Sequence, residues 1–152
     1  MNPQAAQTYL RTRVLTATPE QLQIMLYDGS IRFAEQARLA LLKNDFENTY
    51  NNVSRAQKIV LELTTSLKHQ IAPELCAKLA SLYNYIYRKL TEASVKHTIE
   101  AIDEAIKLLK FQRETWSMLL DQLAKEKAAN HASRLDMPAP SAQMEASISM
   151  QG

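Results

Sequence analysis

The chain has 152 residues, enough for a single domain whose hydrophobic core needs neither metals nor disulfides. Hydrophobic residues make up 46% of the chain, while only two glycines and five prolines are present, so all-β and α/β folds are disfavoured and an all-α protein is predicted. The formal net charge of +2 comes from basic and acidic residues that are interspersed along the chain, which argues against the concentrated basic stripe of a nucleic-acid-binding protein.

The first helix with a clear start signal is predicted from Pro19 to about Leu42. Thr18-Pro-Glu-Gln21 is a capping box with proline at the first helical position, and such a box satisfies two backbone donors reciprocally. The first dozen residues show no convincing long helix, and we expect residues 1–17 to form a short arm.

The second predicted helix carries apolar residues at the alternating three-and-four spacing of a bundle seam and ends near His69. Its seam residues are Phe46, Tyr50, Val53, Val60, Leu63 and Leu67. A third helix begins at Pro73, because proline is tolerated in the first helical turn. Its seam is expected at Leu75, Leu79, Leu82, Ile86, Leu90 and Ala93.

The fourth predicted helix is the most regular and runs from Ile99 to about Lys127. Its seam is Ile99, Ile102, Ile106, Leu109, Trp116, Leu120 and Leu123. Because four helices of similar length are joined by short connections, we predict an all-α, antiparallel up-and-down four-helix bundle over residues 18–128. A short N-terminal arm, residues 1–17, precedes it, and a disordered, flexible C-terminal tail, residues 129–152, follows it.

Two of the predicted helices carry apolar residues on more than one face. On the first, Leu22, Met25, Leu26, Gly29 and Phe33 share the side expected to face the core, whereas Ile24 and Ile31 point away with Tyr27 beside them. Gly29 is costly inside a helix, so we expect a neighbouring helix or a bulky side chain to approach it closely.

The fourth helix repeats this pattern, with Phe111 and Met118 opposite its seam and Leu108 adjacent, and the third adds Tyr83 and Tyr87 at the flank of its stripe. Outward apolar faces of this kind are usually covered. The sequence leaves three covers open: the chain's own arm or tail, a second copy of the chain, or an amphipathic segment of another protein.

The sequence offers no constellation typical of catalysis. It lacks the Glu-x-x-His pair of di-metal bundles, a phosphate-binding glycine loop and a nucleophile elbow. His69, His97 and His131 fall at a helix end, in a connection and in the tail, where they are surface or capping residues more often than ligands. We therefore expect neither enzymatic activity nor a metal or cofactor.

The expected location is the cytoplasm. No segment approaches the roughly 18 consecutive apolar residues of a membrane span, and the N-terminus lacks the features of a signal peptide, so membrane insertion is not expected. Cys76 is the single cysteine and cannot form an intrachain disulfide.

An ordered set of motifs spread over all four predicted helices resembles the flagellin-specific export chaperones of the FliS family. The set consists of Tyr9 followed by Val14, Thr16-Ala-Thr-Pro-Glu-Gln-Leu22, Met25-Leu-Tyr-Asp-Gly29, Ala56-Gln-Lys-Ile59, Glu62-Leu63, Leu82-Tyr-Asn-Tyr-Ile86, Leu90-Thr-Glu-Ala93 and Arg113-Glu-Thr-Trp116. The resemblance covers about Tyr9 to Leu123, with Tyr87 and Ser94 as departures from the family pattern.

The resemblance implies a cytosolic helical bundle that holds the C-terminal segment of flagellin, prevents premature polymerisation and presents the subunit to the type III flagellar export gate. It implies no enzymatic activity and no cofactor. It also gives Tyr9 and Val14 the role of a removable cover over an apolar groove that the client takes over.

Face geometry, rather than the resemblance, supplies the other candidate partner-binding residues. The complete candidate set is Tyr9, Val14, Ile24, Tyr27, Ile31, Tyr83, Tyr87, Leu108, Phe111 and Met118. The expected partners are the flagellin C-terminal region and a component of the flagellar export gate, with a homodimer in the absence of client. The alternative is a self-associating structural helical bundle whose outward stripes pair with each other.

Overall fold

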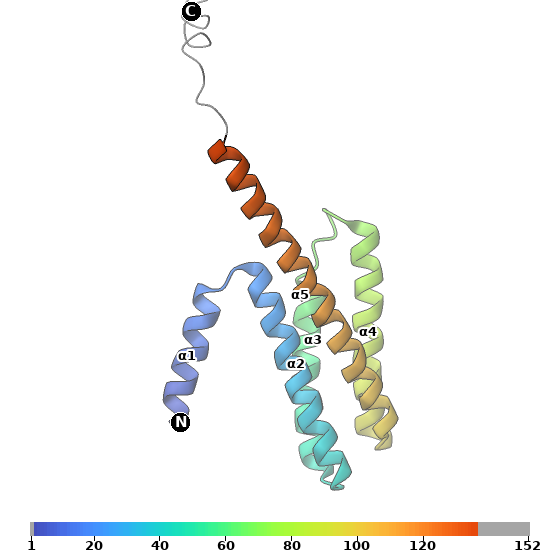
Figure 1. Cartoon of the computed structure of the whole chain (residues 1–152). Helices are drawn as coiled ribbons and strands as arrows, with labels where there is room; N and C mark the ends of the chain where they lie inside the picture. The colour runs from blue at the N-terminus through green and yellow to red at the C-terminus, as the bar shows by residue number, and fades with distance from the viewer. Residues whose placement is uncertain (1, 137–152) are drawn as a thin grey trace, which may run out of the picture. The chain divides into compact units, whose positions relative to one another are not determined.

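The computed structural model describes residues 2–136, and within that range the chain is all-helical, with five α-helices and no strand (Figure 1). The helices are α1 (Pro3–Thr16), α2 (Pro19–Leu42), α3 (Phe46–Thr65), α4 (Pro73–Lys96) and α5 (Ile99–Asp136). The predicted all-α class is therefore confirmed.

Local signals fix where most of the helices begin. The capping box predicted at the start of α2 is present, with the Thr18 hydroxyl accepting from the Gln21 amide at 3.1 Å and the Gln21 side chain accepting from the Thr18 amide at 3.0 Å. Asp45 caps α3 by accepting from the Asn48 amide. Helix α3 ends at Thr65, a few residues before the predicted end near His69.

The N-terminal residues form a helix, so the prediction that they lack one is wrong. The Asn2 side chain caps α1 by accepting from the Gln4 amide, and Pro3 occupies the first turn. The hydroxyls of Thr8 and Thr12 donate to carbonyls one turn back along the helix. None of the residues of α1 is buried.

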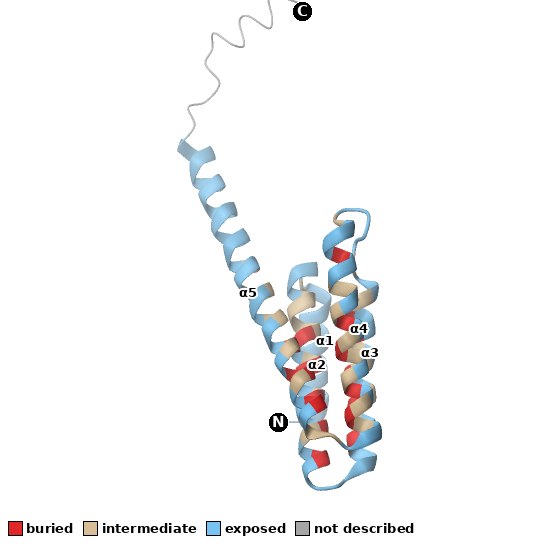
Figure 2. Cartoon of the chain, turned by 90° about the vertical axis from the view of Figure 1, so that its right-hand side faces the viewer, coloured by how far each residue is buried: buried red, intermediate tan, exposed pale blue. Residues whose placement is uncertain are grey.

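The hydrophobic core is built from α2, α3, α4 and the part of α5 that precedes Ser117 (Figure 2). Helix α2 lies beside α3, and α3 lies beside α4. The large side chains with 0% of their surface exposed include those of Leu63, Ile86, Leu90, Ile102 and Leu109. This core closes without any contribution from α1.

The core-facing side of α2 differs from the predicted one. Its buried positions include the small residues Ser30, Ala34 and Ala37, which lie between the two large apolar stripes seen in the sequence. Phe33, expected in the core stripe, is only partly buried at its flank. Small side chains allow neighbouring helices to approach closely, and they carry too little hydrophobicity to be recognised from the pattern alone.

Gly29 confirms the predicted close approach. A Cβ at this position would lie 3.1 Å from Cδ1 of Ile59 on α3, so the neighbouring side chain fills the space above the glycine. The two helices therefore pack tightly at this point.

Four residues predicted in the bundle seams lie at the surface instead: Phe46, Tyr50, Leu75 and Leu123. Thr49 and Cys76 take buried positions close to the first three in the sequence. Phe46 stacks on His97, with ring centroids 3.7 Å apart and an interplanar angle of 7°. His97 ends α4 in the left-handed backbone conformation, where a glycine is more usual.

Helix α5 continues to Asp136, so the predicted end near Lys127 is too early. The chain divides into two compact units at Ser117, and residues 118–136 of α5 form the described part of the second unit. Residues 129–136, predicted as part of a flexible tail, are helical, and the remainder of that predicted tail, residues 137–152, lies outside the described residues. The boundaries predicted for the arm, the bundle and the tail stay a prediction.

Candidate partner-binding surface

Two of the candidate residues belong to α1 and are open to solvent. Tyr9 is 65% exposed and Val14 is 43% exposed, and the neighbouring Leu10 and Leu15 are exposed as well. The guanidinium of Arg13 lies 5.9 Å from the centre of the Tyr9 ring. In this structure α1 exposes apolar side chains to solvent, and none of its residues is buried.

The outward position predicted for Ile31, with Tyr27 beside it, is wrong, and so is the flank position predicted for Tyr83. Their exposed fractions are 2%, 9% and 1%, and all three belong to the core cluster. Tyr27 and Ile31 flank the small-residue face of α2, which is the side that turns inward. Tyr83 shares the inward side of α4 with Ile86, one turn further along.

Three candidates are half-buried on three different helices: Ile24 on α2, Tyr87 on α4 and Leu108 on α5. Tyr87 and Leu108 pack against the core cluster from its edge. These three candidates are thus partly covered by the fold rather than fully open to a partner.

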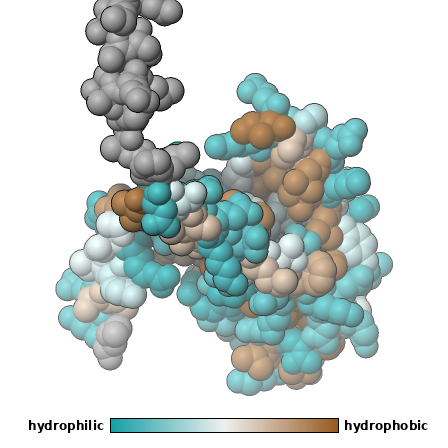
Figure 3. Space-filling model, turned by 45° about the horizontal axis from the view of Figure 1, so that its top comes forward, coloured by the Kyte–Doolittle hydropathy of each residue, from teal (hydrophilic) through white to brown (hydrophobic). Residues whose placement is uncertain are grey.

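Phe111 and Met118 are exposed, as the fourth-helix pattern predicts. Phe111 retains 64% of its accessible surface and lies in the first unit, whereas Met118 retains 62% and lies in the second. In the face shown in Figure 3, apolar patches are separated by polar side chains. On this face the exposed apolar surface is thus divided into several patches.

A buried tyrosine pair joins α2 to α4 through the core. The hydroxyls of Tyr27 and Tyr83 are hydrogen-bonded to each other, and the two rings are tilted by 52° with centroids 6.5 Å apart. Burial raises the pKa of the Tyr27 phenol, and burial together with the bond to Tyr27 raises the pKa of Tyr83 far above its usual range. Both phenols are therefore neutral and act as structural hydrogen-bonding groups.

A groove between α2 and α5 was not recognised in the sequence. Its volume is about 440 Å³, and its lining combines the apolar side chains of Leu39 and Ile106 with four charged ones: Glu35, Arg38, Asp103 and Lys110. Ion pairs join the two helices across it, at 2.5 Å between Arg38 and Asp103 and at 2.8 Å between Lys110 and Glu35. These groups are half-exposed, so each pair contributes little to stability.

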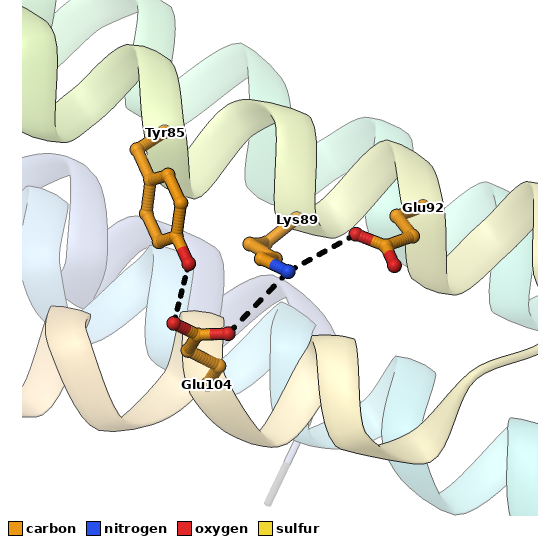
Figure 4. Close-up of polar contacts among 4 residues, drawn as sticks. All are labelled: Tyr85, Lys89, Glu92 and Glu104. Carbon is orange, nitrogen blue, oxygen red and sulfur yellow. Dashed lines mark hydrogen bonds and ion pairs between the residues drawn. The ribbon is translucent and has the colours of Figure 1, made fainter.

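Helices α4 and α5 are joined by a second polar network (Figure 4). The Tyr85 hydroxyl donates to Glu104 at 2.5 Å, and the Lys89 ammonium lies between Glu92 and Glu104, at 3.2 and 3.5 Å. The hydrogen bond from Tyr85 lowers the pKa of the Glu104 carboxyl and raises the pKa of the phenol, while Glu92 raises the pKa of Lys89. Glu104 is therefore ionised, and through Tyr85 and Lys89 it joins α5 to α4.

The described residues hold no group of three or more His, Cys, Asp or Glu side chains arranged to bind a metal ion. Within the same part of the chain, no helix has the length and apolar character needed to span a membrane.

The fold and its surface define an all-α protein with a closed core and exposed apolar side chains on several helices, which suits the binding of another polypeptide. The comparisons with known proteins narrow this class. The family model described as "Flagellar protein FliS" matches residues 1–124, so the chain belongs to the FliS family.

Relatives agree with this assignment, and a solved structure shares the fold. The chain is 32% identical over 126 residues to the flagellar secretion chaperone FliS of Bacillus subtilis, covering 83% of this chain and 92% of that protein. It is 31% identical over 115 residues to its Salmonella typhimurium counterpart, covering 75% and 85%. A structure described as the crystal structure of a flagellar chaperone from bacteria shares the fold, with a TM-score of 0.64, 21% identity, and coverage of 78% of this chain and 97% of that one. The family is one of chaperones and not a class of enzymes.

Proposed function

We propose that this protein is a cytoplasmic flagellar export chaperone that binds the C-terminal segment of flagellin. By holding that segment it prevents premature polymerisation and delivers the subunit to the type III flagellar export gate. Membership of the FliS family over residues 1–124 carries this proposal, and the relatives described as flagellar secretion chaperones support it.

The exposed apolar side chains supply the physical basis for client binding. The core already buries its own hydrophobic residues, so exposed side chains such as Phe111 are not needed to close the fold. A client segment that is disordered when free can fold onto these side chains and lose ordering entropy in exchange for buried area. Burial of roughly 1,000 Å² of apolar surface contributes on the order of 25 kcal/mol before ordering and association costs offset most of it.

The separation of the apolar patches favours an extended client over a compact one. Half-buried Ile24, Tyr87 and Leu108 come from three helices, and an extended chain can contact residues on several helices more easily than a compact one can. We propose that these residues and Phe111 are client contacts of the first unit, and we propose Met118 separately as a client contact of the second unit.

We further propose that α2, α3, α4 and α5 form an antiparallel up-and-down bundle. The connections between successive helices are short, and all four contribute to one core cluster. This arrangement leaves every helix with one side open to a client.

Helix α1 is proposed to contact the client directly through Tyr9 and Val14, since both are exposed. Deletion of residues 1–15 is then expected to weaken client binding. If the deletion instead tightens or accelerates binding, the segment acts as the removable cover that the family resemblance implies.

The test of the proposal is capture of a flagellin C-terminal segment by purified protein carrying single substitutions. Phe111→Asp places a charge on a 64% exposed position and is expected to abolish or greatly weaken capture while leaving helical content and thermal unfolding nearly unchanged. Ile71→Asp is the matched control, because Ile71 is 77% exposed and lies outside the candidate set. Equal capture by both variants would remove Phe111 from the binding surface.

A self-associating structural bundle is the second candidate function. The observation that favours it is α1, a helix with four exposed apolar side chains and no buried residue. Light scattering over a concentration series separates the two functions: a constant dimer that ignores flagellin supports self-association, whereas a monomer that forms a one-to-one complex supports the chaperone.

A further inference from the structure

Two arginines share one aromatic ring on the outer side of the contact between α2 and α3. The guanidinium of Arg32 lies 5.0 Å from the centre of the Phe33 ring, and that of Arg55 on the neighbouring helix lies 5.7 Å from the same ring. Phe33 packs against the core cluster, so the ring is held in place, while both arginines are exposed. The structure thus gathers two positive charges over one fixed apolar surface.

No acidic side chain neutralises this pair. Among the described residues, neither Arg32 nor Arg55 forms an ion pair. The acids within one turn of Arg32 on α2 are Asp28 and Glu35, and each is bound instead to a basic side chain of α5, Asp28 to Arg113 and Glu35 to Lys110.

The surroundings of Arg55 on α3 add no negative charge either. The residues three and four positions away along the helix are Asn51, Asn52, Lys58 and Ile59. Lys58 even adds a third positive charge within one turn of Arg55. The acidic side chains near Arg32 on α2 thus form ion pairs with α5, and the surface around Arg32 and Arg55 keeps its positive charge.

We infer that Arg32 and Arg55, held over Phe33, form a docking site for acidic side chains of the bound client. The planar fork of a guanidinium binds a carboxylate through two parallel hydrogen bonds, and the Phe33 ring holds both guanidinium groups over the same surface. The inference rests on the proposed function, because it states which chemistry of the flagellin segment is recognised beside the apolar contacts. An acidic segment steered to this site would also bind faster at low ionic strength.

The experiment measures the fluorescence anisotropy of a dye-labelled flagellin C-terminal segment titrated with the full-length protein at about 50 mM and about 500 mM salt. The variants are Arg32→Glu and Arg55→Glu, with Arg88→Glu as the control, since Arg88 is an exposed arginine on α4. All three positions are exposed, and thermal unfolding monitored by circular dichroism checks that the variants stay folded.

Arg32→Glu and Arg55→Glu are expected to raise Kd about tenfold each at low salt and far less at high salt, while Arg88→Glu changes Kd less than about twofold. Substitution of every Asp and Glu in the segment by Asn and Gln should abolish the difference between the variants. The inference is overturned if the two variants weaken binding no more than Arg88→Glu does. It is also overturned if they abolish binding of a mixed-sequence DNA oligonucleotide while leaving flagellin binding intact.

A glutamate-rich peptide of unrelated sequence is the second probe, and it separates this inference from the proposed function. If the wild-type protein fails to bind flagellin but binds the acidic peptide through Arg32 and Arg55, the proposed client is wrong and the docking site stands. If flagellin binds but neither arginine affects either probe, the proposed function stands and the docking site is refuted.

Discussion

The hydrogen bond between Tyr27 and Tyr83 predicts a strongly non-additive effect on stability. With only 2% and 1% of these residues exposed, removal of one hydroxyl leaves the other in the core with no access to water. A lost hydrogen bond costs about 1 kcal/mol net, and an orphaned buried hydroxyl costs about 1 to 3 kcal/mol. Tyr27→Phe and Tyr83→Phe are each expected to lower the free energy of unfolding by about 1 to 3 kcal/mol.

The double variant removes both hydroxyls and leaves no orphaned group, so it should cost less than the sum of the single variants by about 1 to 2 kcal/mol. Urea unfolding monitored by circular dichroism gives the four free energies of the cycle, with an unchanged m-value as the check on two-state behaviour. Tyr50→Phe is the control, because Tyr50 is 64% exposed and should change stability by less than about 0.5 kcal/mol. Additive effects, or single variants no worse than the control, would refute the coupling between the two hydroxyls.

Three further predictions concern the helices and their core. Gly29→Ala gains up to about 1 kcal/mol of helix propensity but places Cβ 3.1 Å from Cδ1 of Ile59, so the free energy of unfolding in urea should change little. In the Ile59→Val background, where Cδ1 is absent, the same Gly29→Ala substitution should be clearly stabilising. Thr18→Ala removes the capping-box hydrogen bond to Gln21 and should lower stability by about 1 kcal/mol in the same assay. Because the pKa of Tyr83 is raised in the folded protein, this tyrosine ionises first in the unfolded chain, above about pH 10. Its contribution to stability is therefore fully present below that pH and falls by about 1.4 kcal/mol per pH unit above it. Tyr83→Phe should remove this contribution from the pH dependence of the unfolding free energy.

Helix starts were predictable because their signals are local. The capping box at Thr18 and the prolines at positions 19 and 73 act through backbone groups within one turn, and the structure places helix starts at these points. The same kind of signal precedes α1, where Asn2 caps a helix that begins with Pro3. This helix was not predicted because its apolar residues show only weak helical periodicity. An explicit search for cap and proline pairs would have found this helix.

The inward face of α2 could not be predicted from hydrophobic periodicity. Ser30, Ala34 and Ala37 carry little hydrophobicity, and they turn inward because a neighbouring helix needs the space. Because large residues lie on either side of that face, the core was predicted on one of those sides instead. Tyr27 and Ile31 on the other side were therefore assigned outward.

The buried tyrosine pair depended on information that no single helix contains. Tyrosine often lies at a half-exposed position, so Tyr83 alone was assigned to the flank of its helix. Its burial is compatible with the core because Tyr27 supplies a hydrogen-bond partner from 56 residues away. Phe111, by contrast, lies opposite a regular apolar stripe, and its predicted exposure is confirmed.

The central claim is that a helical protein with a closed core binds a disordered flagellin segment through side chains that its own fold leaves exposed. The most direct measurement is a calorimetric titration of the full-length protein with the flagellin C-terminal segment, combined with light scattering of the product. The account predicts a one-to-one complex with a large negative heat-capacity change from apolar burial. Absence of heat and an unchanged mass at every ratio of the two components would contradict it.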